Sequence, residues 1–224
     1  TLKAAEVLDQ WRPKLRSTDV EERRTAASRI MSQGRWARPV VPDLIQALGD
    51  EDDLVRMLAA QTLGYVGEPA GSAASEALQR ALGDTHQQVR HQAAVALASV
   101  DRETTANLDV LMDRLTNRPP DDPHGTWPIQ RREAAEALGV MGSRARAALP
   151  VLRSLTGEAE GVGEAAQKAI DRIAKGDGEF RDVRFSAGAS AAKSGVPARD
   201  GPASGQAGTI RRVVVTGDKA VVEG

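Results

Sequence analysis

The sequence contains no cysteine and only six aromatic residues among its 224. Without cysteine the chain has no disulfide, no cysteine-ligated zinc or iron–sulfur site and no thiol nucleophile. With so few aromatic side chains, the core of a chain of this length has to be built from Ala, Leu, Val and Ile. Such small and aliphatic side chains favour closely packed helices over one large globular centre.

An excess of one charge sign is also missing, because 30 Lys and Arg residues balance 31 Asp and Glu residues. This balance argues against a general nucleic-acid-binding protein, which usually carries a basic excess. The charges are nevertheless unevenly distributed along the chain. The net charge is +4 over residues 1–38, −8 over 39–180 and +3 over 181–224. A basic patch for an acidic partner, docking of the tail on the body and a merely solvated surface all remain open.

A long apolar run is the third missing feature, since no stretch approaches the ~20 residues that span a bilayer. We therefore expect a soluble protein without a membrane span. Residue 1 is Thr rather than Met, so we expect a fragment or a processed product. A missing targeting segment then says little, and the compartment stays open between cytoplasm and periplasm.

What the chain does contain is an internal repeat. In four segments an Arg is followed three residues later by Ala-Ala and seven residues later by a large aliphatic residue. These key arginines are Arg23, Arg56, Arg90 and Arg131. A fifth segment keeps the pair Ala165-Ala166 and has Val162 in place of Arg. Successive key positions are 33, 34, 41 and 31 residues apart, which is typical of a helical solenoid with one insertion.

Each unit has the pattern of two helices, A and B, most clearly in the second unit. Pro42 suits the first turn of helix A, and Gly49 ends that helix. The acidic run 50–53 suits the start of helix B, which continues to Gly67. One such hairpin cannot cover its own apolar faces, so neighbouring units must stack.

The pattern Pro-x-Leu, Leu-Gly-Asp, Val-Arg-x-x-Ala-Ala and Leu-Gly resembles a HEAT repeat, and most closely the short bacterial subtype named for phycobilisome lyases. The resemblance covers about residues 5–175. It implies an all-α, right-handed α-solenoid of about five helical hairpins, with the B helices on the concave side. It also implies a protein-binding scaffold more often than an enzyme. The expected units are 5–38, 39–71, 72–104, 105–146 and 147–176, within a solenoid domain 1–180.

The residues after the repeats have a different composition. Residues 181–208 are rich in Gly, Ala, Ser and Pro and are predicted to be a flexible linker. In residues 209–224, two apolar runs flank Thr216-Gly217-Asp218, which is typical of a short β-hairpin. Because two strands alone are marginal in water, the segment is a docked hairpin, a strand offered to a partner or the start of a further domain.

The key arginines form the most regular polar feature. One interpretation is a cationic ladder for phosphates or carboxylates. The other pairs each Arg with loop carboxylates such as Asp19, Asp50 or Asp84 and so joins neighbouring repeats. An acidic residue precedes the Arg in every copy, so we favour the structural role.

A second feature is the face of each B helix that starts one residue after the key position and recurs every four residues. Its residues vary between units while the core positions repeat, as expected of a recognition surface. We predict that a partner contacts Arg24, Met57, Gln61, Tyr65, His91, Val95 and Arg132 on this stripe. The alternative is that Met57 and Val95 pack against adjacent helices.

The insertion in the fourth unit is a third feature, and it explains the spacing of 41. Trp127 is a candidate interface anchor there, unless it only covers the start of its helix B. Asp121, Asp122 and His124 are a weak candidate metal site, because they share one proline-rich loop with no ligand opposite. Trp11, at helical spacing from Leu8 and Leu15, is expected in the core.

No catalytic motif is present. The three histidines are scattered, and no His-x-x-x-His pair, nucleophile elbow or phosphate-binding glycine loop occurs. We predict a non-enzymatic scaffold for a protein or peptide partner, monomeric in isolation, without cofactor, metal or nucleic acid. By resemblance, the alternatives are a chromophore-lyase-like or chaperone-like protein and, ranked lower, a DNA glycosylase. The HEAT-like iron hydroxylases use His-Glu pairs, which this chain lacks.

Overall fold

The computed structural model describes residues 2–118, 125–159, 161–175, 214–215 and 220–221. The chain divides into two compact units, Thr1–Phe185 and Ser186–Gly224. The α-helices of the first unit are α1 (Leu2–Trp11), α2 (Val20–Met31), α3 (Val41–Ala47), α4 (Asp53–Val66), α5 (Ser72–Ala81), α6 (Gln87–Val100), α7 (Leu108–Thr116), α8 (Trp127–Met141), α9 (Leu149–Leu155) and α10 (Val162–Lys175). Short 3-10 helices join them at η1 (Pro13–Arg16), η2 (Gly34–Val40), η3 (Glu68–Ala70) and η4 (Gly142–Ala148).

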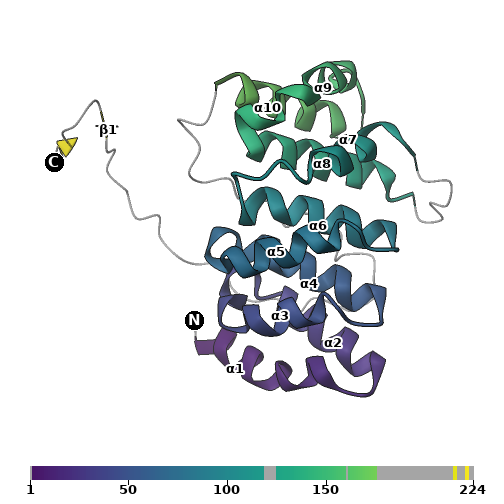
Figure 1. The fold of residues 1–224 in the computed structure, drawn as a ribbon, viewed down its shortest axis with the longest axis vertical. Helices are drawn as coiled ribbons and strands as arrows, with labels where there is room; N and C mark the ends of the chain where they lie inside the picture. Colours follow the sequence, from purple (N-terminus) through teal and green to yellow (C-terminus); the bar gives the residue numbers. More distant parts are fainter. Residues whose placement is uncertain (1, 119–124, 160, 176–213, 216–219, 222–224) are drawn as a thin grey trace. The chain divides into compact units, whose positions relative to one another are not determined.

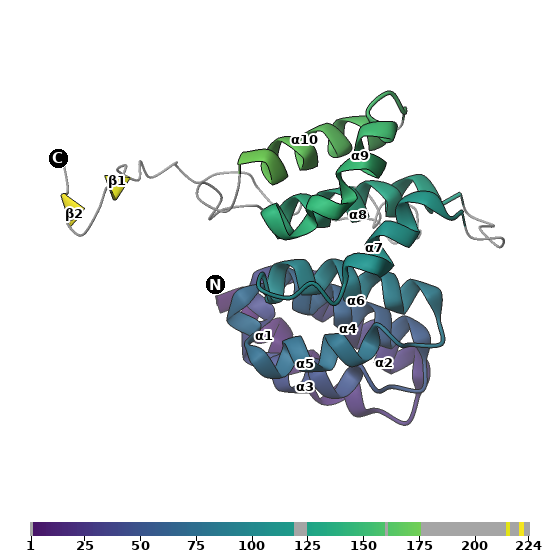
Figure 2. The ribbon, with the colours of Figure 1, turned by 45° about the horizontal axis from the view of Figure 1, so that its top comes forward.

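The α-helices of the first unit form consecutive A–B pairs that stack in chain order, from α1–α2 to α9–α10 (Figure 1). Each odd-numbered helix packs on the even-numbered helix that follows it, and the even-numbered B helices pack on one another in succession. The same order is visible after rotation (Figure 2). The all-α solenoid expected from the repeat is therefore confirmed.

Local sequence explains where the helices begin and end. Asp19 and Asp52 cap α2 and α4, because their carboxylates accept hydrogen bonds from the backbone N–H groups of Glu21 and Val55, respectively. Gly67, with φ of 70°, ends α4 in the left-handed region that other residues rarely adopt. Pro42 occupies the first turn of α3, where its missing N–H costs nothing.

The core consists mainly of Ala and Leu, and it divides in two at α6. One face of α6, with Ala93 and Leu97, joins the cluster formed by the first three units. Another face, with Ala94 and Ala98, joins the cluster of the last two units. As expected, large aromatic side chains are scarce in this core. Trp11 is partly buried and packs against the first cluster.

Two glycines set how closely B helices approach. A Cβ at Gly64 of α4 would lie 3.0 Å from the Cα of Ala96 in α6, and one at Gly139 of α8 would lie 3.1 Å from the Cα of Ala169 in α10. Both glycines are eight residues after a key arginine. The corresponding residue of α6 is Ala98, so the junction between α6 and α8 does not have this glycine contact.

In the second unit, the described residues form the strands β1 (Val214–Val215) and β2 (Ala220–Val221). They pair antiparallel, with Val214 opposite Val221. The predicted linker, residues 181–208, lies outside the described residues. None of the helices in the described part of the chain has the length and apolar character needed to cross a membrane.

Candidate partner-binding surface

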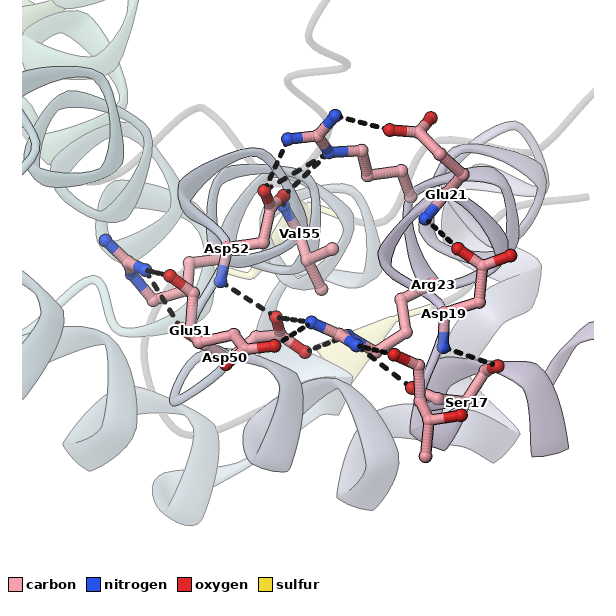
Figure 3. Close-up of polar contacts among 11 residues, drawn as sticks. Ser17, Asp19, Glu21, Arg23, Asp50, Glu51, Asp52 and Val55 are labelled. Carbon is pink, nitrogen blue, oxygen red and sulfur yellow. Dashed lines mark hydrogen bonds and ion pairs between the residues drawn. The ribbon is translucent and has the colours of Figure 1, made fainter.

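The key arginines clamp consecutive units together. Arg23 is 6% exposed, and its Nη1 donates to the carbonyls of Ser17 and Thr18, in the loop that precedes its own helix. Its Nη2 donates to Asp50 Oδ1 at 3.1 Å and Glu51 Oε1 at 2.8 Å, in the corresponding loop of the next unit. Figure 3 shows the Arg23 side chain lying between these two loops.

Arg56 and Arg131 repeat this arrangement. Arg56 donates to the carbonyls of Asp50 and Glu51 and forms a bidentate pair with Asp84 of the third unit. Arg131 donates to the carbonyl of Leu115 and pairs with Glu158 of the fifth unit. Arg56 lowers the pKa of Asp84 below its ordinary value, and Arg131 does the same for Glu158. In each case the carboxylate comes from the following unit, 27 or 28 residues after the Arg, and not from the acid that precedes it.

Arg90 is the exception among the four. It donates to the carbonyls of Asp84 and Thr85 in its own loop. Within the part of the chain that the structure describes, no carboxylate pairs with it. The residues 27 and 28 positions later are Asn117 and Arg118, because the insertion of the fourth unit begins there.

The stripe of the B helices is partly accessible. Arg24, Gln61, Tyr65, Val95 and Arg132 are all half-buried, so each keeps some surface for a partner. Arg24 is already engaged with Asp52, which it binds through Nε and Nη2, and with Glu21. We call the accessible residues of α4, α6 and α8 the B-helix face: Gln61, Tyr65, Val95, Arg132 and Glu136.

The prediction that His91 contacts a partner is wrong. Its side chain is fully buried between α6 and α8, where Nε2 lies 3.1 Å from Glu133 Oε2. The first positions of the stripe in the other units, Arg24, Met57 and Arg132, are only half-buried, so full burial at this position is particular to α6. Met57 and Val95 pack against the two core clusters, as the packing alternative states, but each keeps part of its surface accessible.

Comparison with known protein families agrees with the geometry. A family model described as HEAT repeats matches residues 8–74 and 41–124, and one described as PBS lyase HEAT-like repeat matches residues 130–157. The chain is a HEAT-repeat protein. A search of the curated proteins found no match.

Behind the B-helix face of this HEAT-repeat protein lies a polar cluster that the sequence reasoning missed. Glu133 of α8 accepts from Gln92 Nε2 at 3.2 Å, besides its contact with His91. Gln130 donates to Gln88 at 2.8 Å across the same junction. A signal was available two residues after the key arginine, where the third and fourth units have Gln92 and Glu133 and the first two have Thr25 and Leu58.

Two titratable groups of the face have displaced pKa values. Burial raises the pKa of Tyr65, and the nearby charge of Glu133 adds to the effect. Tyr65 therefore stays a neutral phenol, whose oxygen accepts from Gln61 Nε2 at 3.0 Å. Burial also raises the pKa of Glu136, although Arg132, with Nε 3.9 Å from the carboxylate, opposes the shift.

Trp127 is the first residue of α8, and its ring lies 4.4 Å from the Arg131 guanidinium. It therefore covers the start of that helix and the clamp to the fifth unit, while remaining half-buried. The loop candidates for a metal, residues 121, 122 and 124, lie outside the described residues. No metal-binding group of three His, Asp or Glu side chains occurs among the residues that are described.

A cleft of about 420 Å³ lies where the first two HEAT repeats meet. It is lined by charged groups that neutralise one another. Asp43 is 4% exposed and pairs with Arg12 at 2.7 Å and Arg16 at 2.9 Å, and Arg23 pairs with Asp50 and Glu51. The cleft therefore shows the charge pattern of a structural joint and not of a ligand site.

Proposed function

We propose that this HEAT-repeat protein is a non-enzymatic scaffold whose B-helix face binds a protein or peptide partner. The observation that carries the proposal is the contrast between core and face. Core positions repeat from unit to unit, whereas the accessible positions hold Gln61 and Tyr65 on α4, Val95 on α6, and Arg132 and Glu136 on α8. Such variation on a regular framework suits recognition of one particular ligand surface.

The clamp of Arg56 on Asp84 supports this role, because it holds the units of α4 and α6 at a fixed spacing before a partner arrives. A surface that is rigid in advance loses less conformational entropy on binding. Tyr65 suits the centre of such a surface. It offers apolar ring area and a hydroxyl whose proton remains available to a partner acceptor, which are the properties of interface anchors.

Partner charge can be inferred in outline. Arg132 and Glu136 place both signs on one turn of α8, and Arg172 and Lys168 contribute positive potential at Glu136. The face therefore favours a partner with mixed polar groups around an apolar centre, which is the composition of an amphipathic helix or strand.

Site-specific photo-crosslinking tests the proposal. A benzophenone amino acid at Gln61 or Val95 should crosslink a defined protein, whereas one at Glu76, exposed on α5, should not. Tyr65→Ala and Arg132→Glu should each lower the crosslinking yield at Gln61 at least fivefold while helicity stays unchanged. Charged residues at Met57 or His91 are unsuitable, because Met57 packs against the core of the first three units and His91 is fully buried.

Equal crosslinking from Glu76, or a yield that neither variant changes, would count against the B-helix face. Co-purification of a bilin chromophore would favour the chromophore-lyase alternative, and salt-sensitive binding to DNA would favour the glycosylase alternative. Either result would replace the scaffold proposal.

A further inference from the structure

The 3-10 helix η2 sorts its residues into three rows. A 3-10 helix has three residues per turn, so residues i and i+3 lie one above the other. Ala37 and Val40 face the core and are 0% and 1% exposed. Arg35 and Arg38 form a second row, and Trp36 and Pro39 form a third, and all four are exposed. An apolar strip therefore runs beside a cationic strip on one short element. We call these four residues the Trp36 surface.

Trp36 is unusually exposed for a large aromatic side chain. It is 48% exposed, and the Arg35 guanidinium lies 5.0 Å from its ring centroid. Besides Trp36, Leu54 is the only large apolar side chain that is exposed within the described residues. A half-exposed tryptophan next to arginine has the composition of an interface hot spot.

The charges around Trp36 differ from those elsewhere in the first repeat. Every basic side chain from residue 12 to 24 has an ion pair with an acid: Arg12, Lys14, Arg16, Arg23 and Arg24. By contrast, Arg35 and Arg38 have no ion pair to a carboxylate within the part of the chain that the structure describes. Within the described residues, Lys3, Arg29, Arg35 and Arg38 are the basic side chains of residues 1–38 without such a pair, and two of these four flank Trp36.

The corresponding helix η4 provides an internal reference. Gly34-Arg35-Trp36-Ala37-Arg38 aligns with Gly142-Ser143-Arg144-Ala145-Arg146, and Ala37 and Ala145 are both buried. Arg144, at the position of Trp36, pairs with Glu103 of the preceding connection. In η3, Glu68 likewise pairs with Arg102 at 2.9 Å. The equivalent connections therefore join units to each other, whereas η2 presents an aromatic ring.

We propose that the Trp36 surface binds a segment of a partner protein that carries acidic side chains next to an apolar one. Arg35 and Arg38 supply bidentate donors that match carboxylates, and Trp36 with Pro39 supplies the apolar contact. The chain offers only a short cationic row here and has a net charge of −8 over residues 39–180, so a phosphate backbone passing along the body would be repelled. This surface is separate from the B-helix face, and the two are tested independently.

An array of random dodecapeptides probed with the purified chain tests the proposal. Wild type should enrich peptides with two or more Asp or Glu residues adjacent to an apolar residue. For the best peptide, Trp36→Ala and the pair Arg35→Glu/Arg38→Glu should each raise the Kd at least tenfold, and the charge-reversed pair should enrich basic peptides instead. Raising the salt concentration should weaken the wild-type interaction.

Arg146→Glu is the matched control, because Arg146 occupies the position of Arg38 in η4 and is also exposed. It should change the Kd less than twofold, as should Tyr65→Ala on the B-helix face. The proposal is overturned if wild type enriches no acidic peptides or if the acidic preference survives in Arg35→Glu/Arg38→Glu. It is also overturned if these residues instead mediate concentration-dependent self-association or binding to single-stranded DNA.

Discussion

Arg56 and Asp84 form a bidentate ion pair, with Nε to Oδ2 at 2.7 Å and Nη2 to Oδ1 at 2.9 Å, and this pair joins the second HEAT repeat to the third. The side chains are only 13% and 11% exposed. Because Arg56 also satisfies the carbonyls of Asp50 and Glu51, one guanidinium connects two loops that belong to consecutive units. The stacking of the repeats therefore depends on polar clamps as well as on apolar burial.

Removing this clamp should destabilise the protein strongly. Arg56→Met leaves the Asp84 carboxylate without its charge partner in a largely buried site, and breaking a buried pair in this way costs about 3–5 kcal/mol. Urea unfolding followed by circular dichroism measures the loss. Lys168→Met provides the control, since its pair with Glu164 is exposed and worth under about 1 kcal/mol. Similar costs for the two variants would contradict the clamp.

The clamps should also make stability depend on pH on the acid side. Arg56 holds the pKa of Asp84 below its ordinary value, and Arg24 and Arg131 do the same for Asp52 and Glu158. A lowered folded-state pKa gives stability that is complete above the unfolded pKa of about 4 and is lost as pH falls through the folded value. We expect the melting temperature to fall as pH drops from about 5 to 2. In Arg56→Met the fall should be smaller, and parallel curves for the two proteins would contradict this cause.

The missing carboxylate at Arg90 can be supplied by mutation. Asn117→Asp with Arg118→Glu places carboxylates 27 and 28 residues after Arg90, the spacing at which Asp50 and Glu51 bind Arg23. We expect a gain of about 1 kcal/mol in the free energy of unfolding, the value of a typical intramolecular hydrogen bond. Adding Arg90→Met should abolish the gain. A gain that persists without Arg90 would show that the effect arises elsewhere, for example from removing the positive charge of Arg118.

Because α4 and α6 approach closely at Gly64, a side chain at this position should destabilise the protein. Gly64→Ala places a Cβ 3.0 Å from the Cα of Ala96, so the two helices must separate, and overpacking of this kind costs about 1–3 kcal/mol. Differential scanning calorimetry should show a lower melting temperature despite the higher helix propensity of Ala. Gly157→Ala is the control, because nothing lies within 4 Å of a Cβ there. A higher melting temperature for Gly64→Ala would contradict the close contact.

Much of the fold follows from the sequence alone, for reasons that are local. The pair Ala59-Ala60 at a fixed distance from Arg56 marks helix B, and the capping residue Asp52 and the stop at Gly67 mark its ends. These signals depend on backbone chemistry within one or two turns, so a single unit is enough to recognise them. Repetition of the unit then implies stacking, because one hairpin cannot bury its apolar faces alone.

The candidate sites depended more on contacts between units, which spacing within one helix does not determine. Helical periodicity placed His91 on the same row as Val95, but only the packing of α8 on α6 buried His91 against Glu133. Likewise, the basic excess of residues 1–38 is visible in the sequence. Which arginines are neutralised was decided by the next unit. It supplies Asp43 of α3 and Asp50 of the following loop to some of them and leaves Arg35 and Arg38 beside Trp36. The sequence by itself thus determined the helices and their order, because these follow from local hydrogen bonding and apolar periodicity. The tertiary structure decided which charges and rings reach the surface, because that depends on groups far apart in the chain.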